Sequence, residues 1–266
     1  MDLGLDGRGC VVTGASRGIG LEVARRLCAE GALVILIARS ADTLDEAAEA
    51  CGSEGGRAIP LPLDITEPDA AVRVLAAATK ELGTLDVLVN NAGTALWRDL
   101  EDVPDEDWYA AWELNVMAPL RLMRAAIPPM RERGYGRVVN VASTAGKRPT
   151  ATMPEYSVAK AAQLSLSRLH ADLYAADGVL VNAVCPGPAK SELWMEPGGL
   201  LDQSQAATGA SSRDEAERAM ASKRPISRLA EPGEIADAIV FLCSERASYV
   251  AGAAWSVDGG TVQVII

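Results

Sequence analysis

The stretch Thr13-Gly14-Ala15-Ser16-Arg17-Gly18-Ile19-Gly20 decides the fold of this chain. It follows the apolar run Arg8–Val12, which predicts a short buried strand, and it opens a helical recurrence of apolar residues at Ile19 and Val23. A second apolar run, Leu33–Ala38, completes a strand–helix–strand unit. Glycines let the backbone approach a pyrophosphate, and the helix amino end offers free N–H groups to it. The predicted cofactor contacts here are Gly14, Ser16, Arg17, Gly18, Ile19 and Gly20.

The residues after the second predicted strand bear on the choice between NAD and NADP. An NAD site normally has an acid about 20 residues beyond the glycines, bonded to the ribose 2′-hydroxyl. Here Arg39 follows the strand, and the next acid is Asp42. Arg39 and Arg17 can bracket a 2′-phosphate, because a guanidinium pairs with phosphate in a bidentate fashion. NADP is therefore favoured over NAD, with merely solvated arginines as the alternative.

Two further predicted strands lead into polar or small residues. The run Ala58–Leu63 ends beside Asp64 and Ile65, at the expected adenine position, so Asp64 is a candidate partner of the adenine amino group. The alternative is that Asp64 only caps the next helix. The run Leu85–Val89 leads into Asn90-Asn91-Ala92-Gly93, whose asparagines can also hold the central sheet together. The expected cofactor contacts in these turns are Asp64, Ile65, Asn91, Ala92 and Gly93.

Groups that can move a proton follow the next predicted strand. Val138–Ala142 predicts a buried parallel strand, so Ser143 falls at its carboxyl end, where open α/β sheets bind ligands. Pro154 marks the start of a helix on which Tyr156 and Lys160, four residues apart, share one face. The ammonium favours the phenolate, and the serine can hydrogen-bond a substrate carbonyl. An isolated Tyr-x-x-x-Lys is usually a helix-surface pair, so these residues gain weight only from their placement in the chain.

A polar residue interrupts the long helix predicted over Asp105–Met130. Asn115 lies in a buried apolar stretch, four residues before Pro119. A buried amide needs hydrogen-bond partners, which the backbone or an ordered water can supply.

The carboxyl-terminal third predicts a sixth strand at Leu180–Cys185 and a rigid turn at Pro186-Gly187-Pro188. Residues 192–212 show no clear period, whereas 213–224 is helical again. We expect 190–224 to form a mobile lid over the active edge and to select the substrate. Aromatic and sulfur side chains near this pocket could stack on a ring or simply pack: Trp97, Trp194 and Met195.

Composition limits the function classes. The 266 residues, 49% of them hydrophobic, suit one α/β domain over 1–266, and no apolar run is long enough to span a bilayer. The net charge of −11 argues against nucleic-acid binding, which needs a basic surface. Five cysteines without Cys-x-x-Cys spacing indicate neither disulfides nor a zinc site. We expect an unexported, cytoplasmic protein without a metal, and a structural role for the sole histidine, His170.

These motifs together resemble the short-chain dehydrogenase/reductase family, in family order and over essentially the whole chain. The resemblance implies an α/β, Rossmann-type, doubly wound parallel sheet of seven strands with helices on both faces. It implies a nicotinamide cofactor and a role for each catalytic residue: Ser143 polarises the carbonyl, Tyr156 donates the proton, Lys160 binds the nicotinamide ribose and lowers the tyrosine pKa, and Asn115 holds a water that links Lys160 to solvent. Further cofactor contacts implied by the family are Tyr156, Lys160, Pro186, Gly187 and Ser191.

Within the family, Arg228–Ile235 and the ending Val257–Gly260 are most similar to 3-oxoacyl-acyl-carrier-protein reductases. Such reductases commonly present an arginine before the glycine that closes the catalytic helix, to meet the acidic carrier. Here Asp177 precedes Gly178, which places an acyl-carrier-protein partner in doubt. The residues that could form a compensating basic patch, or be merely solvated, are Arg131, Arg133, Lys147 and Arg148.

Three functions are compatible with these residues. The first is an NADP(H)-dependent reductase that converts a ketone, such as a 3-oxoacyl thioester, to a secondary alcohol. The second is an NAD(P)-dependent secondary-alcohol dehydrogenase acting on a cyclic, sugar-like or steroid substrate. The third is a non-catalytic cofactor sensor, which would not need the full catalytic set. The family resemblance also implies a homotetramer that pairs the two long helices.

Overall fold

The computed structural model, which describes residues 1–263, contains one sheet of seven parallel strands in the order β3-β2-β1-β4-β5-β6-β7. The last three residues of the predicted domain 1–266 lie outside the described residues. The doubly wound sheet expected from the sequence is therefore confirmed. The strands are β1 (Gly9–Thr13), β2 (Leu33–Ala38), β3 (Arg57–Pro62), β4 (Val87–Asn90), β5 (Gly136–Val141), β6 (Val179–Pro186) and β7 (Ala254–Val257).

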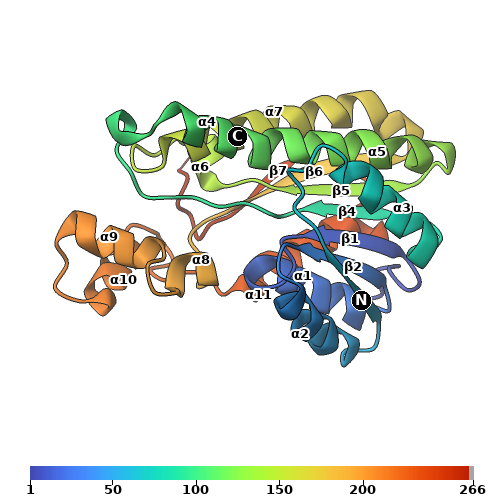
Figure 1. Cartoon of the computed structure of the whole chain (residues 1–266), viewed down its shortest axis with the longest axis horizontal. Coiled ribbons are helices and arrows are strands. Elements are labelled where there is room, and N and C mark those ends of the chain that lie inside the picture. Colours follow the sequence, from blue (N-terminus) through green and yellow to red (C-terminus); the bar gives the residue numbers. More distant parts are fainter. Residues whose placement is uncertain (264–266) are drawn as a thin grey trace.

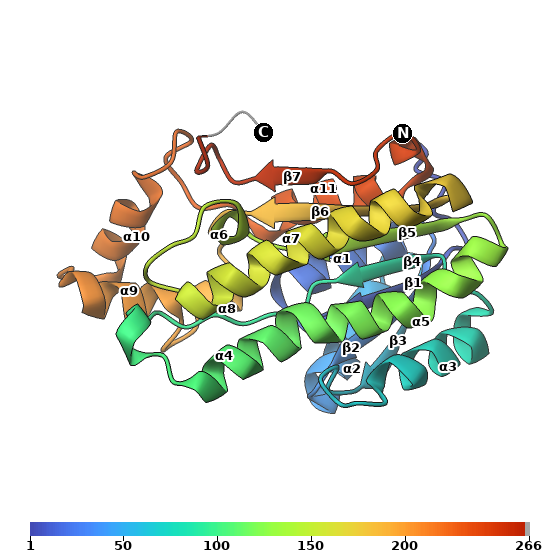
Figure 2. The same ribbon diagram turned by 90° about the horizontal axis from the view of Figure 1, so that it is seen from above.

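Helices cover both faces of this sheet (Figures 1 and 2). One face carries α1 (Gly18–Ala29), α2 (Ala41–Gly52) and α11 (Pro232–Cys243). The other carries α3 (Ala70–Leu82), α4 (Asp105–Trp112), α5 (Ala118–Glu132) and α7 (Pro154–Tyr174). Short helices lie near the carboxyl ends of the strands: α6 (Thr144–Lys147), α8 (Glu192–Met195), α9 (Leu200–Thr208) and α10 (Arg213–Ala221). Single 3-10 turns occur at Leu100–Asp102, Ala175–Asp177 and Glu245–Ala247.

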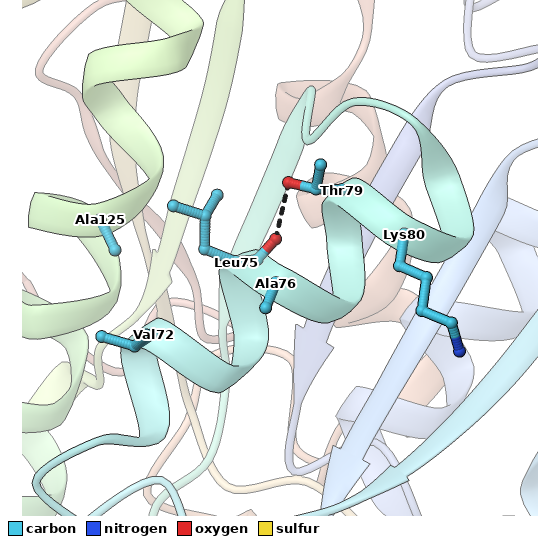
Figure 3. Close-up of a pocket in the computed structure, with 6 residues that line it drawn as sticks. All are labelled: Val72, Leu75, Ala76, Thr79, Lys80 and Ala125. Atoms are coloured by element: carbon cyan, nitrogen blue, oxygen red, sulfur yellow. Dashed lines mark hydrogen bonds between the residues drawn. The ribbon is translucent and has the colours of Figure 1, made fainter.

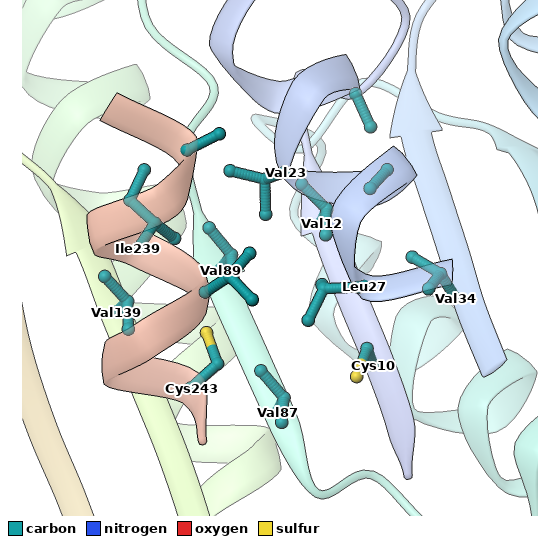
Figure 4. Close-up of a cluster of buried hydrophobic side chains, with 14 of the residues drawn as sticks. Cys10, Val12, Val23, Leu27, Val34, Val87, Val89, Val139, Ile239 and Cys243 are labelled. Carbon is teal, nitrogen blue, oxygen red and sulfur yellow. The ribbon is translucent and has the colours of Figure 1, made fainter. Parts of the chain in front are cut away.

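The strands are apolar on both faces because each face packs against helices. In β1, Cys10 and Val12 join the core under α1 and α11, whereas Val11 points into the core under α3 and α5. Figure 4 shows the first of these cores, in which Val23 of α1 and Ile239 of α11 meet above the sheet. Continuous burial of this kind explains why the strands lack a polar alternation.

The strand order places a ligand crevice at a defined point. The chain runs from β1 outward to β3 and then returns to β4 on the other side of β1. Ligands of doubly wound sheets bind outside the carboxyl ends of the strands at such a reversal. The turns after β1 and β4 both face this crevice, and so do the predicted glycine and asparagine motifs.

The structure differs from the sequence-based expectation in two segments. The helix predicted over Asp105–Met130 is two α-helices joined by a π-helical segment, Glu113–Met117, which contains Asn115. The segment without a clear period contains α8 and α9, since a four-residue helix and an alanine- and glutamine-rich helix are too short or too weakly patterned to show one. Figure 2 shows β6 and β7 pointing towards these helices.

Candidate active site

The glycine turn after β1 is held by close backbone packing. Gly14 has φ of +65°, and a Cβ on Gly20 would lie 2.1 Å from the Gly14 carbonyl oxygen. Asn91 Nδ2 donates to the carbonyl oxygens of Thr13 and Gly14 at 2.9 and 3.1 Å. Thr13 Oγ1 in turn accepts from the Asn91 and Ala92 amides at 3.0 and 3.1 Å. The turns after β1 and β4 thus form one rigid floor.

The features of this floor fit a dinucleotide. Gly18 begins α1 with φ of +57°, and Arg17 precedes it in an extended conformation without a side-chain cap from residues 1–263. The first amides of α1 are therefore available to an anion, and the helix dipole favours negative charge there. The glycines leave space for a pyrophosphate to approach the backbone. Ser16 and Ile19 are half-buried in the same turn.

The residues predicted to recognise the adenosine end are only partly brought together. Arg39 is exposed just after β2. Its positive charge makes the smallest of the contributions that lower the pKa of Asp64. Asp64 Oδ1 mainly accepts from the Thr66 amide and hydroxyl at 2.9 and 2.7 Å, which lower that pKa most. Asp64 therefore closes a local turn and does not cap α3, whose N-cap is Asp69. The side chain of Ile65 packs in the core beneath α3 and α5.

Arg17 has a partner that the sequence did not indicate. Its Nη1 lies 2.9 and 2.8 Å from the two carboxylate oxygens of Glu196, which follows α8. Next to it, a Cβ on Gly18 would lie 3.0 Å from Glu192 Oε2 and 3.2 Å from Ser191 Cβ. The start of the predicted lid thus lies directly against the glycine turn.

The turn after β6 carries the other predicted cofactor contacts. Pro186 ends β6, and the Gly187 amide donates to the Val257 carbonyl oxygen at 3.0 Å. A Cβ on Gly187 would lie 2.9 Å from Asp258 Cα, so the turn needs glycine for close packing. Ser191 is buried at the N-cap of α8.

Three predicted residues meet beside β4. A Cβ on Gly93 would lie 3.2 Å from Asn115 Oδ1 and 3.5 Å from Lys160 Nζ. Asn115 is fully buried in its π-helical segment, and its Nδ2 donates to the Ala111 carbonyl oxygen at 2.9 Å. The backbone thus supplies the partner expected for this amide. Its Oδ1 has no hydrogen-bond partner within residues 1–263, and π-helical segments often occur at functional sites.

Ser143 and Tyr156 form the proton-transfer side of the site. Ser143 is the N-cap of α6, and its Oγ accepts from the Ala145 amide at 3.0 Å. Tyr156 lies in the first turn of α7, half-buried. Burial raises the pKa of Tyr156 to about 12, although a hydrogen bond with Ser143 acts to lower it. At neutral pH the phenol therefore keeps its proton.

Lys160 is buried one turn further along α7, with 2% of its surface exposed. Its Nζ donates to the Val141 carbonyl oxygen at 2.7 Å and to Gln163 Oε1 at 3.0 Å, and it lies 5.5 Å from the Tyr156 ring centroid. Burial lowers the pKa of Lys160 to about 7, with the Cys185 thiol acting in the opposite direction. Sequence spacing predicted that Lys160 faces Tyr156, but it did not indicate Gln163.

An apolar cluster adjoins the tyrosine. Buried Trp194 and Leu200 form its centre together with Ala95, and Tyr156 packs against it. Three further half-buried residues complete the part nearest the site: Trp97, Met153 and Met195. A substrate carbonyl at Tyr156 would therefore have apolar groups on the side of the predicted lid.

Other features of the surface are not arranged for catalysis. A hollow between α3 and α5 lies away from the active edge (Figure 3). It is lined by Val72, Leu75, Ala76, Thr79, Lys80 and Ala125.

Most residues of the predicted basic patch have partners within the chain. Arg131 pairs with Asp177 at 2.6 Å, and Lys147 donates to the Ala254 carbonyl oxygen at 2.6 Å. Arg133 likewise binds the Leu85 carbonyl oxygen at 2.6 Å.

Among residues 1–263, no helix is long and apolar enough to cross a membrane, and no group of three acids, cysteines or histidines could hold a metal. The five cysteines are buried and free. His170 is buried with Nδ1 2.8 Å from the Leu166 carbonyl oxygen, far along α7 from Tyr156.

Comparisons with known proteins agree with this geometry. Residues 14–262 match a family model described as enoyl-(acyl carrier protein) reductase. The chain is 38% identical over 258 residues to cis-4-hydroxycyclohexanecarboxylate dehydrogenase of Sinomonas cyclohexanicum, with 97% of each chain covered. It is 34% identical over 262 residues to 3-oxoacyl-[acyl-carrier-protein] reductase of Vibrio cholerae, covering 98% of this chain and 100% of the relative.

A solved structure is similar throughout its length. L-sorbose reductase from Gluconobacter frateurii, complexed with NADPH and L-sorbose, superposes with a TM-score of 0.92 at 36% identity and full coverage of both chains. These likenesses extend over nearly the whole chain. The chain therefore belongs to the short-chain dehydrogenase/reductase family, as an oxidoreductase that acts on alcohols or ketones with a nicotinamide cofactor.

Proposed function

We propose that this chain reduces a ketone to a secondary alcohol with NADP(H) as the cofactor. One observation carries the proposal: Lys160 Nζ and Asn115 Oδ1 both lie next to Gly93. Lys160 is also one turn of α7 from Tyr156, whose phenol keeps its proton at neutral pH. The third function considered, a cofactor sensor, has no use for these buried polar side chains, which are costly unless they serve a purpose.

The chain's own residues account for the binding of the cofactor. The turn Gly14–Gly20 and the first amides of α1 would hold the pyrophosphate, and Gly93 would leave room beside the nicotinamide ribose for Lys160. When bound, the nicotinamide supplies a hydride to the carbonyl carbon. Arg39, exposed at the end of β2, would meet a 2′-phosphate, which is the basis for choosing NADP over NAD.

The side chains then manage one proton. Ser143 Oγ accepts from the Ala145 amide, and its own hydroxyl would donate to the substrate oxygen when a substrate is bound. Tyr156 gives its proton to the same oxygen as negative charge develops there. The Lys160 ammonium stabilises the resulting phenolate and returns a proton to it, and Asn115 Oδ1 would hold the water through which Lys160 then regains a proton from solvent.

The apolar cluster favours a compact cyclic ketone as the substrate. Trp194, Trp97 and Met195 offer apolar surface near Tyr156, which suits a ring. The relative from Sinomonas cyclohexanicum is named for a hydroxycyclohexane substrate. On these grounds the cyclic substrate, the second function considered from the sequence, becomes the first choice.

A 3-oxoacyl thioester remains the second candidate, favoured by the similarity to the Vibrio cholerae reductase. A protein-bound thioester is less well supported, because an acidic carrier needs unpaired basic residues. Arg131 is paired with Asp177, and Arg133 and Lys147 donate to backbone carbonyl oxygens. A thioester of coenzyme A does not require a basic surface on which a carrier protein can dock.

The test is oxidation of NADPH and NADH with a cyclic diketone, a steroid ketone, a 3-oxoacyl-CoA and the carrier-protein form of the same acyl group. We expect NADPH turnover, highest with the cyclic ketone, and loss of at least about 1000-fold in kcat in Tyr156→Phe with nearly unchanged NADPH affinity. The matched control is Tyr249→Phe, since Tyr249 is 102% exposed and lies outside the catalytic residues and the long helices. Substantial turnover by Tyr156→Phe would refute the assigned acid.

We also propose a homotetramer in which two long helical segments pair with those of neighbouring subunits. One segment is α4 with α5, and the other is α7. Leu173 of α7 is 56% exposed, whereas Leu114 and Leu164 pack against the core clusters. Other exposed apolar residues on the same two helices are Tyr109, Trp112, Val158 and Leu169. Light scattering of the purified chain measures the assembly, and a monomeric mass would overturn this proposal.

A further inference from the structure

Gln163 is a buried polar residue that the catalytic scheme above does not use. It lies on α7 three positions after Lys160, on the same side of the helix, and has no exposed surface. Its Oε1 accepts a hydrogen bond from Lys160 Nζ at 3.0 Å. Its Nε2 is buried without a hydrogen-bond partner among residues 1–263. An apolar side chain would avoid the cost of burying that amide, so the structure retains the amide at a position where it binds the lysine.

The bonds around Lys160 show what this contact does. An ammonium has three N–H donors. One is taken by the Val141 carbonyl oxygen at 2.7 Å and a second by Gln163. Nζ also lies 3.5 Å from the position of a Cβ on Gly93, on the side where Asn115 Oδ1 is found. Two acceptors therefore anchor the ammonium on the interior side, and a single donor is left for the reacting side.

A buried chain of hydrogen bonds holds Gln163 itself. Its backbone carbonyl oxygen accepts from Ser167 Oγ at 2.7 Å, and Ser167 Oγ accepts from Asn140 Nδ2 at 2.8 Å. Asn140 Oδ1 accepts from Asn90 Nδ2 at 2.7 Å. The middle of α7 is thus tied to β5 and β4, the strands whose carboxyl ends carry Ser143 and Gly93. Buried hydrogen-bond networks of this kind restrict side-chain geometry.

We propose that Gln163 is a positioning residue for the reaction: its Oε1 fixes the Lys160 ammonium and stabilises its charged form, so that one N–H faces Tyr156 and the cofactor. A hydrogen-bond acceptor beside an ammonium favours the protonated state, which opposes the effect of burial. The titratable groups that act on Nζ are Tyr156 of the same helix and the buried Cys185 thiol of β6, whose own pKa burial raises to about 11. Loss of the acceptor would lower the pKa of Lys160.

The test is a direct titration of Lys160 by 13C NMR. The sequence has five lysines, Lys80, Lys147, Lys160, Lys190 and Lys223, so a protein labelled at lysine Cε gives a simple spectrum. Replacing each of the other four by arginine assigns the Lys160 signal. In Gln163→Met, which keeps the side-chain length and removes the acceptor, we expect the Lys160 pKa to fall by about one to two units. In Gln163→Glu, which keeps an acceptor, we expect it to stay at or above the wild-type value.

The matched control is Ser167→Ala, which breaks the buried chain but leaves the acceptor on Lys160. We expect its Lys160 titration to match the wild type. An unmoved pKa in folded Gln163→Met, or an equal fall in Ser167→Ala, would overturn the proposal. If Gln163→Met fails to fold, Gln163→Asn provides the same contrast, because it withdraws the amide by one methylene group.

The inference rests on the proposed catalytic role of Lys160, but the titration needs neither cofactor nor turnover. Its failure and the failure of the proposed reaction are therefore distinguishable. A silent substrate panel would leave the titration result standing. An unmoved titration would remove Gln163 from the scheme and leave Tyr156 and Ser143 as assigned.

Discussion

The glycine turn and the predicted lid face each other across the crevice, but they are held by different forces. The turn is fixed by backbone clearances: Gly14 and Gly20 pack on neighbouring main chain with no room for a methyl group. The lid is fixed by exposed ion pairs and one small apolar cluster. Arg213 pairs with Asp202 at 2.9 Å and Lys190 with Glu217 at 3.2 Å, all on partly exposed side chains.

This contrast has consequences for how each region tolerates change. A clearance of about 2 Å cannot be relaxed without moving the backbone, so substitution there is expected to be severe. An exposed ion pair contributes about 0–1 kcal/mol and can be lost with little effect. The turn is therefore suited to a constant cofactor, whereas the segment predicted to form a lid has weaker restraints of the kind that a mobile lid would need.

The largest effect on cofactor binding is expected for Gly20→Ala. The new Cβ would lie 2.1 Å from the Gly14 carbonyl oxygen and 2.4 Å from Asn91 Nδ2, so the turn must shift. We expect NADPH affinity to fall at least about 100-fold, measured by fluorescence titration. The control is Gly52→Ala at the end of α2, where a Cβ meets nothing within 4 Å and binding should be unchanged. Equal affinities in the two variants would show that the turn is not rigid.

Two cavity-forming substitutions test whether the regions unfold separately. Leu44→Ala on α2 empties the core beside the sheet, so we expect global destabilisation of about 2–5 kcal/mol in a denaturant titration. Trp194→Ala removes the centre of the lid cluster, so we expect faster hydrogen exchange over α8–α10 and a fall of about 10-fold in kcat/KM. If Trp194→Ala accelerated exchange in β1 and β4 as well, the two regions would be one cooperative unit.

The same contrast explains what could be predicted from the sequence. The glycine turn was recognisable because it lies between a predicted strand and a predicted helix. Tyr156 and Lys160 were recognisable because their four-residue spacing follows Ser143 in the chain, although the spacing alone is common. The strands were recognisable as short apolar runs, since both faces are covered. These features depend on local rules of the backbone.

The missed features depend on side chains that meet only in the folded chain. Glu196 pairs with Arg17 across 179 positions, and no local pattern joins them. Gln163 was overlooked because its role depends on the side-chain conformations of a lysine and a glutamine in the interior. The helices of the lid were missed because they are short and because small polar residues hide their period.

A smaller effect is expected at the adenosine end of the crevice. Arg39→Asp places an acid where NAD-binding members of doubly wound folds have one. It also removes the one arginine proposed for the 2′-phosphate that has no ion-pair partner among residues 1–263. We expect the ratio of kcat/KM for NADPH to that for NADH to fall about 10- to 100-fold. Arg148→Asp, at an exposed position near α6, controls for the change in net charge. An unchanged ratio would contradict the assignment of Arg39.

The smallest effect is expected where the two regions touch. Glu196 and a 2′-phosphate would compete for Arg17, whose side chain is 58% exposed, so Glu196→Gln should release the arginine. We expect NADPH to bind about 2- to 5-fold more tightly at low salt, with little difference at 0.5 M salt and none for NADH, because exposed charges are screened. The control is Glu217→Gln, which breaks the lid pair with Lys190 and leaves Arg17 alone. If Glu196→Gln instead left NADPH affinity unchanged and lowered kcat, Arg17 would act as a latch that closes the lid on the glycine turn, and recognition of the 2′-phosphate would depend on Arg39 alone.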